Sequence, residues 1–169
     1  MGATYIASDF HLGHRNIPKY RKYINSVEHN TQLILDEWLA RIKKRDTVYL
    51  LGDIAFDKEH LYMLGNMPGN KILVRGNHDN FVSTHELLDV FSKVEGAMKK
   101  WHMWLTHIPI HPNELRHSFN IHGHVHTATI DDPRYMNVCC DNLMDKTGSN
   151  FIKLETVRDV FNSGKLLGA

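Results

Sequence analysis

The stretch from residue 121 to residue 130 reads IHGHVHTATI and places His122, His124 and His126 at alternate positions. Side chains two residues apart on a strand lie on the same face, so three imidazoles would crowd together there unless a ligand bound them. A single histidine on an apolar face is usually a hydrogen-bonded core residue. Three histidines within five residues favour a metal site, although this stretch alone does not decide between the two interpretations.

Four other apolar runs also end in Asp, Asn or His. They lead into Asp9, Asp53, Asn77 and His107, within the sequences ASDFHLGH, LLGDIAF, VRGNHDN and LTHIP. Ligands of α/β sheets gather beyond the carboxyl ends of the strands, so these ends are expected to converge on one site. The glycines in several of them allow sharp turns or a close approach to a ligand. The histidines of IHGHVH therefore have expected partners elsewhere in the chain.

Short runs rich in Val, Ile and aromatic residues predict strands, and apolar residues at helical spacing predict helices between them. The predicted strands cover residues 4–8, 47–51, 71–75, 94–98, 101–106, 120–122, 136–140 and 151–154. The predicted helices cover residues 27–44, residues 156–161 and a segment after the capping box of Ser83 and Glu86. The first of them has an apolar stripe of Leu35, Leu39 and Ile42, joined by Ile34 and Trp38. This order of elements predicts an α/β (α+β) fold of layered sheets covered by helices.

Length and composition are typical of a globular protein. The 169 residues, 42% hydrophobic and 23% charged, predict a single domain over residues 1–169. A net charge of +1 gives no global field that would attract nucleic acid or a membrane. We see no secretory signal and no apolar run of 18 residues, so a cytoplasmic location is expected. Cys139 and Cys140 are expected to be reduced thiols on opposite faces of a strand.

The strand ends supply a mixed set of candidate metal ligands. Carboxylate, amide and imidazole ligands suit Mn²⁺, Fe²⁺, Co²⁺, Ni²⁺ or Zn²⁺. Seven ligands exceed one tetrahedral site, whereas two ions about 3.5–4 Å apart that share one carboxylate would use them all. The candidate ligands are Asp9, His11, Asp53, Asn77, His107, His124 and His126.

The ordered blocks DFH, GD, GNHD, TH and GHVH resemble the five motifs of the calcineurin-like metallophosphoesterase superfamily, in particular its small single-domain bacterial and viral members. The resemblance implies a four-layer α/β/β/α sandwich of two mixed sheets flanked by helices, and two divalent ions, with Mn²⁺ favoured over Fe, Ni, Co and Zn. It also implies roles for the ligands. Asp9, His11 and His126 would hold the first ion, Asn77, His107 and His124 the second, with Asp53 bridging them and His78 matching the family's catalytic histidine.

The roles of several nearby residues have alternative interpretations. His14 and Arg15 could reach a substrate phosphate, but a solvated loop role is an equal interpretation. Asp79 could orient His78 or cap the following turn. His122 lies one residue outside the matched block, which favours packing or support of a ligand.

The resemblance implies an enzyme whose two cations acidify a bridging water and clamp the phosphate for attack. Protein phosphatases of the superfamily carry an arginine after the GD block, but Asp53 is followed by IAFDKEH, which disfavours that activity. The chain is also too short for the added domains of the repair nucleases. We expect a phosphodiesterase that uses a metal-bridging hydroxide on a nucleotide, a cyclic nucleotide or a nucleic-acid end.

Two alternatives stay open. One is a phosphomonoesterase acting on a small phosphorylated molecule, and the other is a non-catalytic metal-binding interaction module of the same fold. A phosphoester is the only partner that the sequence indicates, since nothing in it points to a membrane or to an obligate protein partner.

Overall fold

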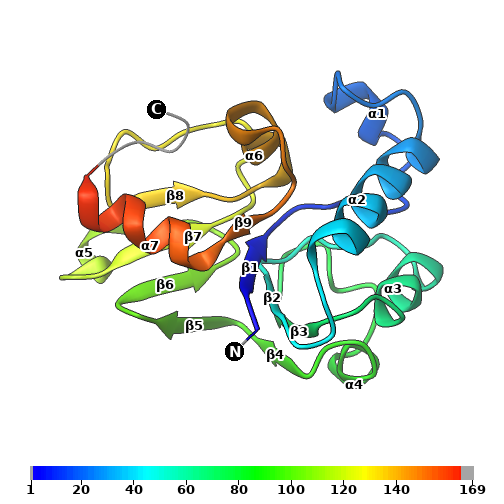
Figure 1. The fold of residues 1–169 in the computed structure, drawn as a ribbon, viewed down its shortest axis with the longest axis horizontal. Helices are drawn as coiled ribbons and strands as arrows, with labels where there is room; N and C mark the ends of the chain where they lie inside the picture. Colours follow the sequence, from blue (N-terminus) through cyan, green and yellow to red (C-terminus); the bar gives the residue numbers. More distant parts are fainter. Residues whose placement is uncertain (1, 165–169) are drawn as a thin grey trace.

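A computed structural model describes residues 2–164, which form two β-sheets with helices around them (Figure 1). The first sheet has the strand order β4-β3-β2-β1-β9 and the second has the order β5-β6-β7-β8. The strands are β1 (Thr4–Ala7), β2 (Thr47–Leu50), β3 (Asn70–Val74), β4 (Lys93–Glu95), β5 (Ala97–Lys100), β6 (Met103–Thr106), β7 (Phe119–His122), β8 (Tyr135–Asn137) and β9 (Ile152–Lys153). Only β9 in the first sheet and β5 in the second run antiparallel to their neighbours, so both sheets are mixed.

Seven helices connect or cover these strands within residues 2–164. They are α1 (Ile17–Tyr20), α2 (Val27–Arg41), α3 (Lys58–Gly65), α4 (Thr84–Leu88), α5 (Pro112–Leu115), α6 (Cys140–Thr147) and α7 (Leu154–Ser163). Figure 1 shows α2, α3 and α4 on one side of the molecule and α6 and α7 on the other. The implied architecture of two mixed sheets flanked by helices is therefore confirmed.

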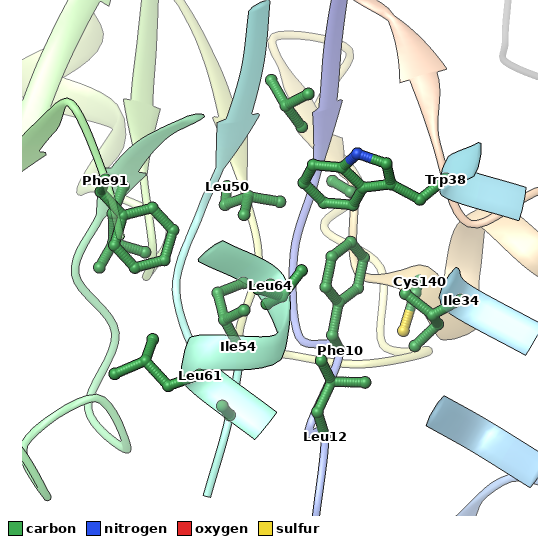
Figure 2. Packing of buried hydrophobic residues seen from close by; sticks show 14 of the residues in the cluster. Phe10, Leu12, Ile34, Trp38, Leu50, Ile54, Leu61, Leu64, Phe91 and Cys140 are labelled. Carbon is green, nitrogen blue, oxygen red and sulfur yellow. The ribbon is translucent and has the colours of Figure 1, made fainter. Parts of the chain in front are cut away.

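One hydrophobic cluster lies between the first sheet and its helices. Leu50 of β2 packs there with Trp38 of α2 and Leu64 of α3. Phe10, just beyond β1, lies in the same cluster with its ring 6.4 Å from that of Trp38 (Figure 2). This packing fixes the segment that follows β1, where the first two candidate ligands lie.

A second cluster lies between the two sheets. Side chains alternate along a strand, so Ile6 and Tyr49 face this cluster while their neighbours face the helices. Leu105 of β6 and Ile121 of β7 meet them from the second sheet. The two sheets thus share one core, and their strand ends are held in a fixed relation.

The predicted strand 94–98 is wrong in one respect, because two strands meet there. The chain leaves the first sheet at the end of β4, passes Gly96 and enters the second sheet as β5. The predicted strand 101–106 begins too early, since Trp101 and His102 have φ of 49° and 63° and form the turn between β5 and β6. Two residues with positive φ are what a tight hairpin requires.

Other predicted boundaries also change. Helix α2 ends at Arg41, and Leu39, placed in the apolar stripe, is 55% exposed. The buried stripe is Ile34, Trp38 and Ile42. The predicted strand 136–140 ends at Asn137, and helix α6 begins at Cys140, so the two cysteines do not lie on opposite faces of a strand, although both are free and buried.

Among the described residues, no helix is long and apolar enough to span a membrane.

Candidate metal centre

The candidate ligands follow parallel strands. Strands β1, β2 and β3 are parallel neighbours in the first sheet, and β6 and β7 are parallel neighbours in the second. Asp9, Asp53 and Asn77 come within three residues of the ends of the first three strands, and His107 and His124 follow the last two. The ligand-bearing strand ends therefore meet on one side of the sandwich, as the sequence predicted.

The first group of candidate ligands is Asp9, His11 and His126, whose possible ligand atoms lie within 4.8 Å of one another. The Nε2 atom of His11 is 3.6 Å from Oδ1 of Asp9. Within residues 2–164, both atoms lack a hydrogen-bond partner, as does Nδ1 of His11, although all three are buried. Buried polar atoms normally have a hydrogen-bond partner. The unpaired atoms of Asp9 and His11 are therefore free to bind a ligand such as a cation.

The second group is Asp53, His107 and His124, with ligand atoms also within 4.8 Å. Nε2 of His107 lies 3.5 Å from Oδ2 of Asp53 and 2.9 Å from Oδ1 of Asn77. The structure thus brings all seven candidate ligands into two adjoining clusters, each with oxygen and imidazole atoms. This donor chemistry fits divalent transition ions, and the unpaired atoms of the first group fit a bound cation.

Five of the candidate ligands have left-handed backbone conformations. The φ values are 59° at Asp9, 52° at His11, 55° at Asp53, 72° at His124 and 52° at His126. A residue other than glycine rarely adopts this region, and each instance costs about 1–3 kcal/mol. Such strain is concentrated at functional sites. Here the strained residues are those whose side chains meet in the two groups of candidate ligands.

Glycines at two block positions leave no room for a side chain. A Cβ atom on Gly123 would lie 2.0 Å from Oγ of Ser8 and 2.4 Å from Oδ2 of Asp9. A Cβ atom on Gly76 would lie 2.3 Å from Oδ1 of Asp53. The glycines of GHVH and GNHD therefore allow one ligand loop to approach the carboxylate of another.

Asp79 links two of these loops. Its carboxylate accepts hydrogen bonds from the backbone N–H groups of Asp53, Ile54 and Gly76, at 2.9, 3.1 and 2.8 Å. Neither role considered for Asp79 from the sequence describes this arrangement. The residue instead holds the turn after β2 against the turn after β3.

His78 lies beside both groups. Its Nε2 atom is 3.9 Å from Oδ2 of Asp53, its ring is 5.9 Å from that of His11, and its side chain is 49% exposed. Its backbone N–H donates a 2.8 Å hydrogen bond to Oδ1 of Asp53. An exposed imidazole at this place can reach a molecule bound at the two groups.

Electrostatics keep the carboxylates charged. Burial alone would raise the pKa of Asp9, but the neighbouring side chains of His11 and Ser8 hold it well below its ordinary value. The pKa of Asp53 is also lowered, against its burial, by its hydrogen bond with His107. The same contact raises the pKa of His107 in spite of its burial. Both carboxylates are therefore available as anionic ligands at neutral pH.

A hollow of about 470 Å³ opens beside the first group. The ring of Phe56 lies 5.2 Å from that of His11, 4.4 Å from that of His14 and 4.9 Å from that of His78. The lining residues are His11, His14, Ile17, Tyr20, Phe56, His78, His126, Thr127 and Asp141. Arg15 is exposed and does not line it, so of the two candidate substrate-binding residues only His14 reaches the hollow.

His122 lies apart from both groups. It is buried, its Nδ1 atom is 3.0 Å from the carbonyl oxygen of Gly123, and burial lowers its pKa. Strand β7 ends at this residue, so His124 and His126 lie beyond the strand and do not share its face. The packing interpretation of His122 agrees with this placement.

Sequence reasoning missed the residues that support the ligands. Asp141 contacts His126, the buried Arg21 contacts Asp141, and the thiol of Cys139 donates to Oδ2 of Asp9 across 3.1 Å. Burial raises the pKa of Cys139, which keeps this thiol protonated. The run NVCC that precedes Asp141 is one more apolar segment ended by a carboxylate, a signal that could have identified it.

Comparisons with known proteins agree with this geometry. The model of the calcineurin-like phosphoesterase family matches residues 3–162. The gene 66 protein of Mycobacterium phage L5 is 30% identical over 166 residues, covering 77% of this chain and 80% of that protein. An uncharacterized protein of Methanocaldococcus jannaschii is 27% identical over 143 residues, covering 81% and 77%.

A protein of unknown function from Aquifex aeolicus has a similar solved structure. Its TM-score is 0.73 at 23% sequence identity, and the alignment covers 95% of this chain and 100% of that one. This likeness confirms the fold, and the family model covers nearly the whole sequence. Members of this family are generally metal-dependent phosphoester hydrolases. With its two clusters of metal-ligating side chains, the chain belongs to the calcineurin-like phosphoesterase family.

Proposed function

We propose that this chain is a phosphodiesterase that hydrolyses a nucleotide, a cyclic nucleotide or a nucleic-acid end with the help of two divalent ions. Asp9, His11 and His126 would hold one ion, and Asn77, His107 and His124 the other, with Asp53 between them. The ions, when bound, would supply an activated water and neutralise charge on the phosphate. Manganese is our first choice of metal, because carboxylate, amide and imidazole ligands together suit it.

The chemistry of the hollow is the observation that supports a diester substrate rather than a monoester. Ile17, Tyr20 and Phe56 line it, and no Lys or Arg is present among the described residues of its wall. Burial lowers the pKa of His14, so that this side chain stays neutral at pH 7. A phosphomonoester is largely a dianion, whereas a diester carries one negative charge and a second organic group. An aromatic wall without fixed cations fits that second group better than it fits a dianion.

The proposed role of His78 is to protonate the oxygen that leaves phosphorus. Its exposed ring borders the hollow and lies beside Asp53. A leaving group in the hollow would therefore have its ester oxygen near this imidazole. Asp53 also fixes the loop of His78 through the hydrogen bond from its backbone N–H.

A matched panel of substrates tests the proposal. The purified chain, loaded with Mn²⁺, should hydrolyse bis(p-nitrophenyl) phosphate and a nucleoside diester with a higher kcat/KM than p-nitrophenyl phosphate. A 2′,3′-cyclic and a 3′,5′-cyclic nucleotide and a dinucleotide then separate the three substrate types. Faster turnover of the monoester would replace the proposal with a phosphomonoesterase. Failure to hydrolyse any phosphoester with any of the five candidate metals would favour the non-catalytic module.

A further inference from the structure

Asp141 lies directly behind one of the candidate ligands. It is in the first turn of α6 and is only 7% exposed. Its Oδ2 atom is 2.8 Å from Nδ1 of His126. A neutral imidazole carries its single proton on one nitrogen only, and a carboxylate can only accept. The proton of His126 therefore sits on Nδ1, which leaves the lone pair of Nε2 for a metal ion.

The buried side chain of Arg21 holds Asp141 in place. Its Nε atom donates to Oδ1 of Asp141 across 2.6 Å, and Nη2 lies 3.3 Å from Oδ2. The remaining donors reach the carbonyl oxygens of Asp9 and Phe10 and Oδ1 of Asn30. A guanidinium has five N–H groups, and here all five have acceptors. One side chain thus fixes both the loop of Asp9 and the carboxylate behind His126.

Within residues 2–164, no carboxylate supports an imidazole of the second group from behind in this way. The Nδ1 atom of His107 lies 2.7 Å from the carbonyl oxygen of Leu51, a neutral acceptor. Its Nε2 atom is already paired with Oδ1 of Asn77, and His124 is exposed. An ion entering this group must break that pairing and order an exposed ring. The unpaired atoms of Asp9 and His11 impose no such cost on the first group.

We propose that Asp141, fixed by Arg21, is a positioning residue that presents Nε2 of His126 and makes the first group bind a divalent ion more tightly than the second. A carboxylate behind a ligating imidazole orients the ring and increases its basicity more than a carbonyl does. The chain would then load its two ions in sequence, first at Asp9, His11 and His126. This inference goes beyond the proposed function because it is independent of the substrate.

The Asp141→Asn variant separates charge and proton placement from packing. The carboxamide has nearly the shape of the carboxylate, and its oxygen can still accept from Arg21. Its NH₂ group would then face Nδ1 of His126 and move the imidazole proton to Nε2, the nitrogen that should bind metal. Isothermal titration of the metal-free chain with Mn²⁺ should show two steps in the wild type. In the variant the tighter step should weaken about 10–100-fold, and the weaker step should change less than threefold.

Asp46 supplies the matched control. It is also 7% exposed and accepts hydrogen bonds from the backbone N–H groups of Ala3 and Lys43, away from the ligands. The Asp46→Asn variant should keep both Mn²⁺ affinities within threefold of the wild type. A second readout uses no metal: long-range ¹H–¹⁵N spectra should show His126 protonated on Nδ1 in the wild type and on Nε2 in the Asp141→Asn variant. The His126→Gln variant assigns that signal by its loss.

Arg21→Lys tests the same network if Asp141→Asn does not fold. Lysine keeps the charge but has no planar fork, so the tighter step should again weaken while the weaker step does not. Equal affinities for both ions in the wild type would overturn the inference. So would an equal weakening of both steps in either variant, which would indicate a general structural role, or an unchanged tighter step.

Discussion

The two sheets contribute different chemistry to the metal centre. The ends of the first sheet supply all the candidate oxygen ligands, Asp9, Asp53 and Asn77, whereas the ends of β6 and β7 in the second sheet supply only imidazoles among the candidates. Each ligand group contains residues from both sheets. A cation bound at either group would therefore link the two sheets, and the site depends on how they pack together.

The two halves also differ in how they are held. The loops of the first sheet bond directly to one another, from the N–H of Asp9 to the carbonyl of Gly52 and from the N–H of His11 to that of Asp53. The loop that carries His124 is tied to the His107 loop by the bond from the N–H of Gly123 to the carbonyl of His107, and to the first sheet by the 2.9 Å bond from the N–H of His124 to Oδ2 of Asp9. The first sheet offers a fixed set of oxygens, and the second brings the buried His107 together with the more exposed His124 and His126.

Metal removal should have the largest effect, because it breaks the link between the sheets. Treatment with EDTA should abolish phosphoester hydrolysis, and adding Mn²⁺ back should restore it. An ion at 100 times its dissociation constant stabilises a fold by about 2.7 kcal/mol, which corresponds to a change of roughly 5–10 °C in Tm for a chain of this size. Thermal unfolding with and without Mn²⁺ measures this change. Full activity in protein shown by elemental analysis to be metal-free would contradict the prediction.

Asp53 and His124 test the two sheets against each other. We expect Asp53→Asn to lower kcat on the order of 10³-fold, because Asp53 is proposed to touch both ions. His124→Ala, which removes one exposed imidazole, should cost only about 10–100-fold at saturating Mn²⁺. Steady-state kinetics over a range of Mn²⁺ concentrations gives both numbers. If Asp53→Asn keeps near-normal turnover once metal is saturating, the bridging assignment is wrong.

His78 follows the first sheet but is not one of the proposed ligands, so it separates acid catalysis from metal binding. A nitrophenolate leaves without a proton, whereas a ribose alkoxide needs one. His78→Asn should therefore lower kcat/KM by about 10²–10⁴-fold on a nucleoside diester and much less on bis(p-nitrophenyl) phosphate. Bound metal should stay at the wild-type amount, as measured by elemental analysis.

Equal losses on the two substrates would instead indicate that His78 stabilises charge on the phosphate. Loss of bound metal in the same variant would show that His78 is a ligand.

The pH should act on metal binding through the imidazoles and not through the carboxylates. The hydrogen bond to Asp141 raises the pKa of His126, and contact with Asp53 raises that of His107 against its burial. The carboxylates of Asp9 and Asp53, with lowered pKa values, stay charged above pH 5. An imidazole must lose its proton to bind a cation, so Mn²⁺ affinity should rise from pH 6 to pH 8, by about tenfold per unit for each proton displaced. Titrations in buffers of different ionisation enthalpy count these protons, and an affinity independent of pH would contradict the prediction.

The side chains that meet in the two clusters could be selected from the sequence because their signal is local. A polar residue that ends an apolar run is visible without any knowledge of the sheet, as at Asp9 and His107. Arg21 and Asp141 meet across 120 positions, so only the tertiary structure brings them together. The sequence does not indicate the role of Phe56 either. Its ring lies against those of three histidines.

Some predicted boundaries of strands and helices were wrong for related reasons. The predicted strand 94–98 contains Glu95 and Gly96, and the chain changes sheets there, but a glycine within a strand pattern does not by itself show that the strand leaves its sheet. The turn at Trp101 and His102 uses residues that rarely adopt positive φ, because the antiparallel register of β5 and β6 requires it. The helical period of α2 predicted an apolar stripe but not its centre, so Leu39 was assigned to the buried side.

The left-handed backbone at the ligands affects how this sequence would respond to selection. Glycine adopts such φ values freely, so His11→Gly, His124→Gly and His126→Gly each relieve a penalty of about 1–3 kcal/mol in the folded chain. His124 is exposed, and glycine there sacrifices little packing. A library screened for heat resistance alone should therefore enrich glycine at position 124. A screen that also demands Mn²⁺ binding should retain histidine there, so the two enrichment profiles would diverge at the metal centre and agree in the hydrophobic clusters.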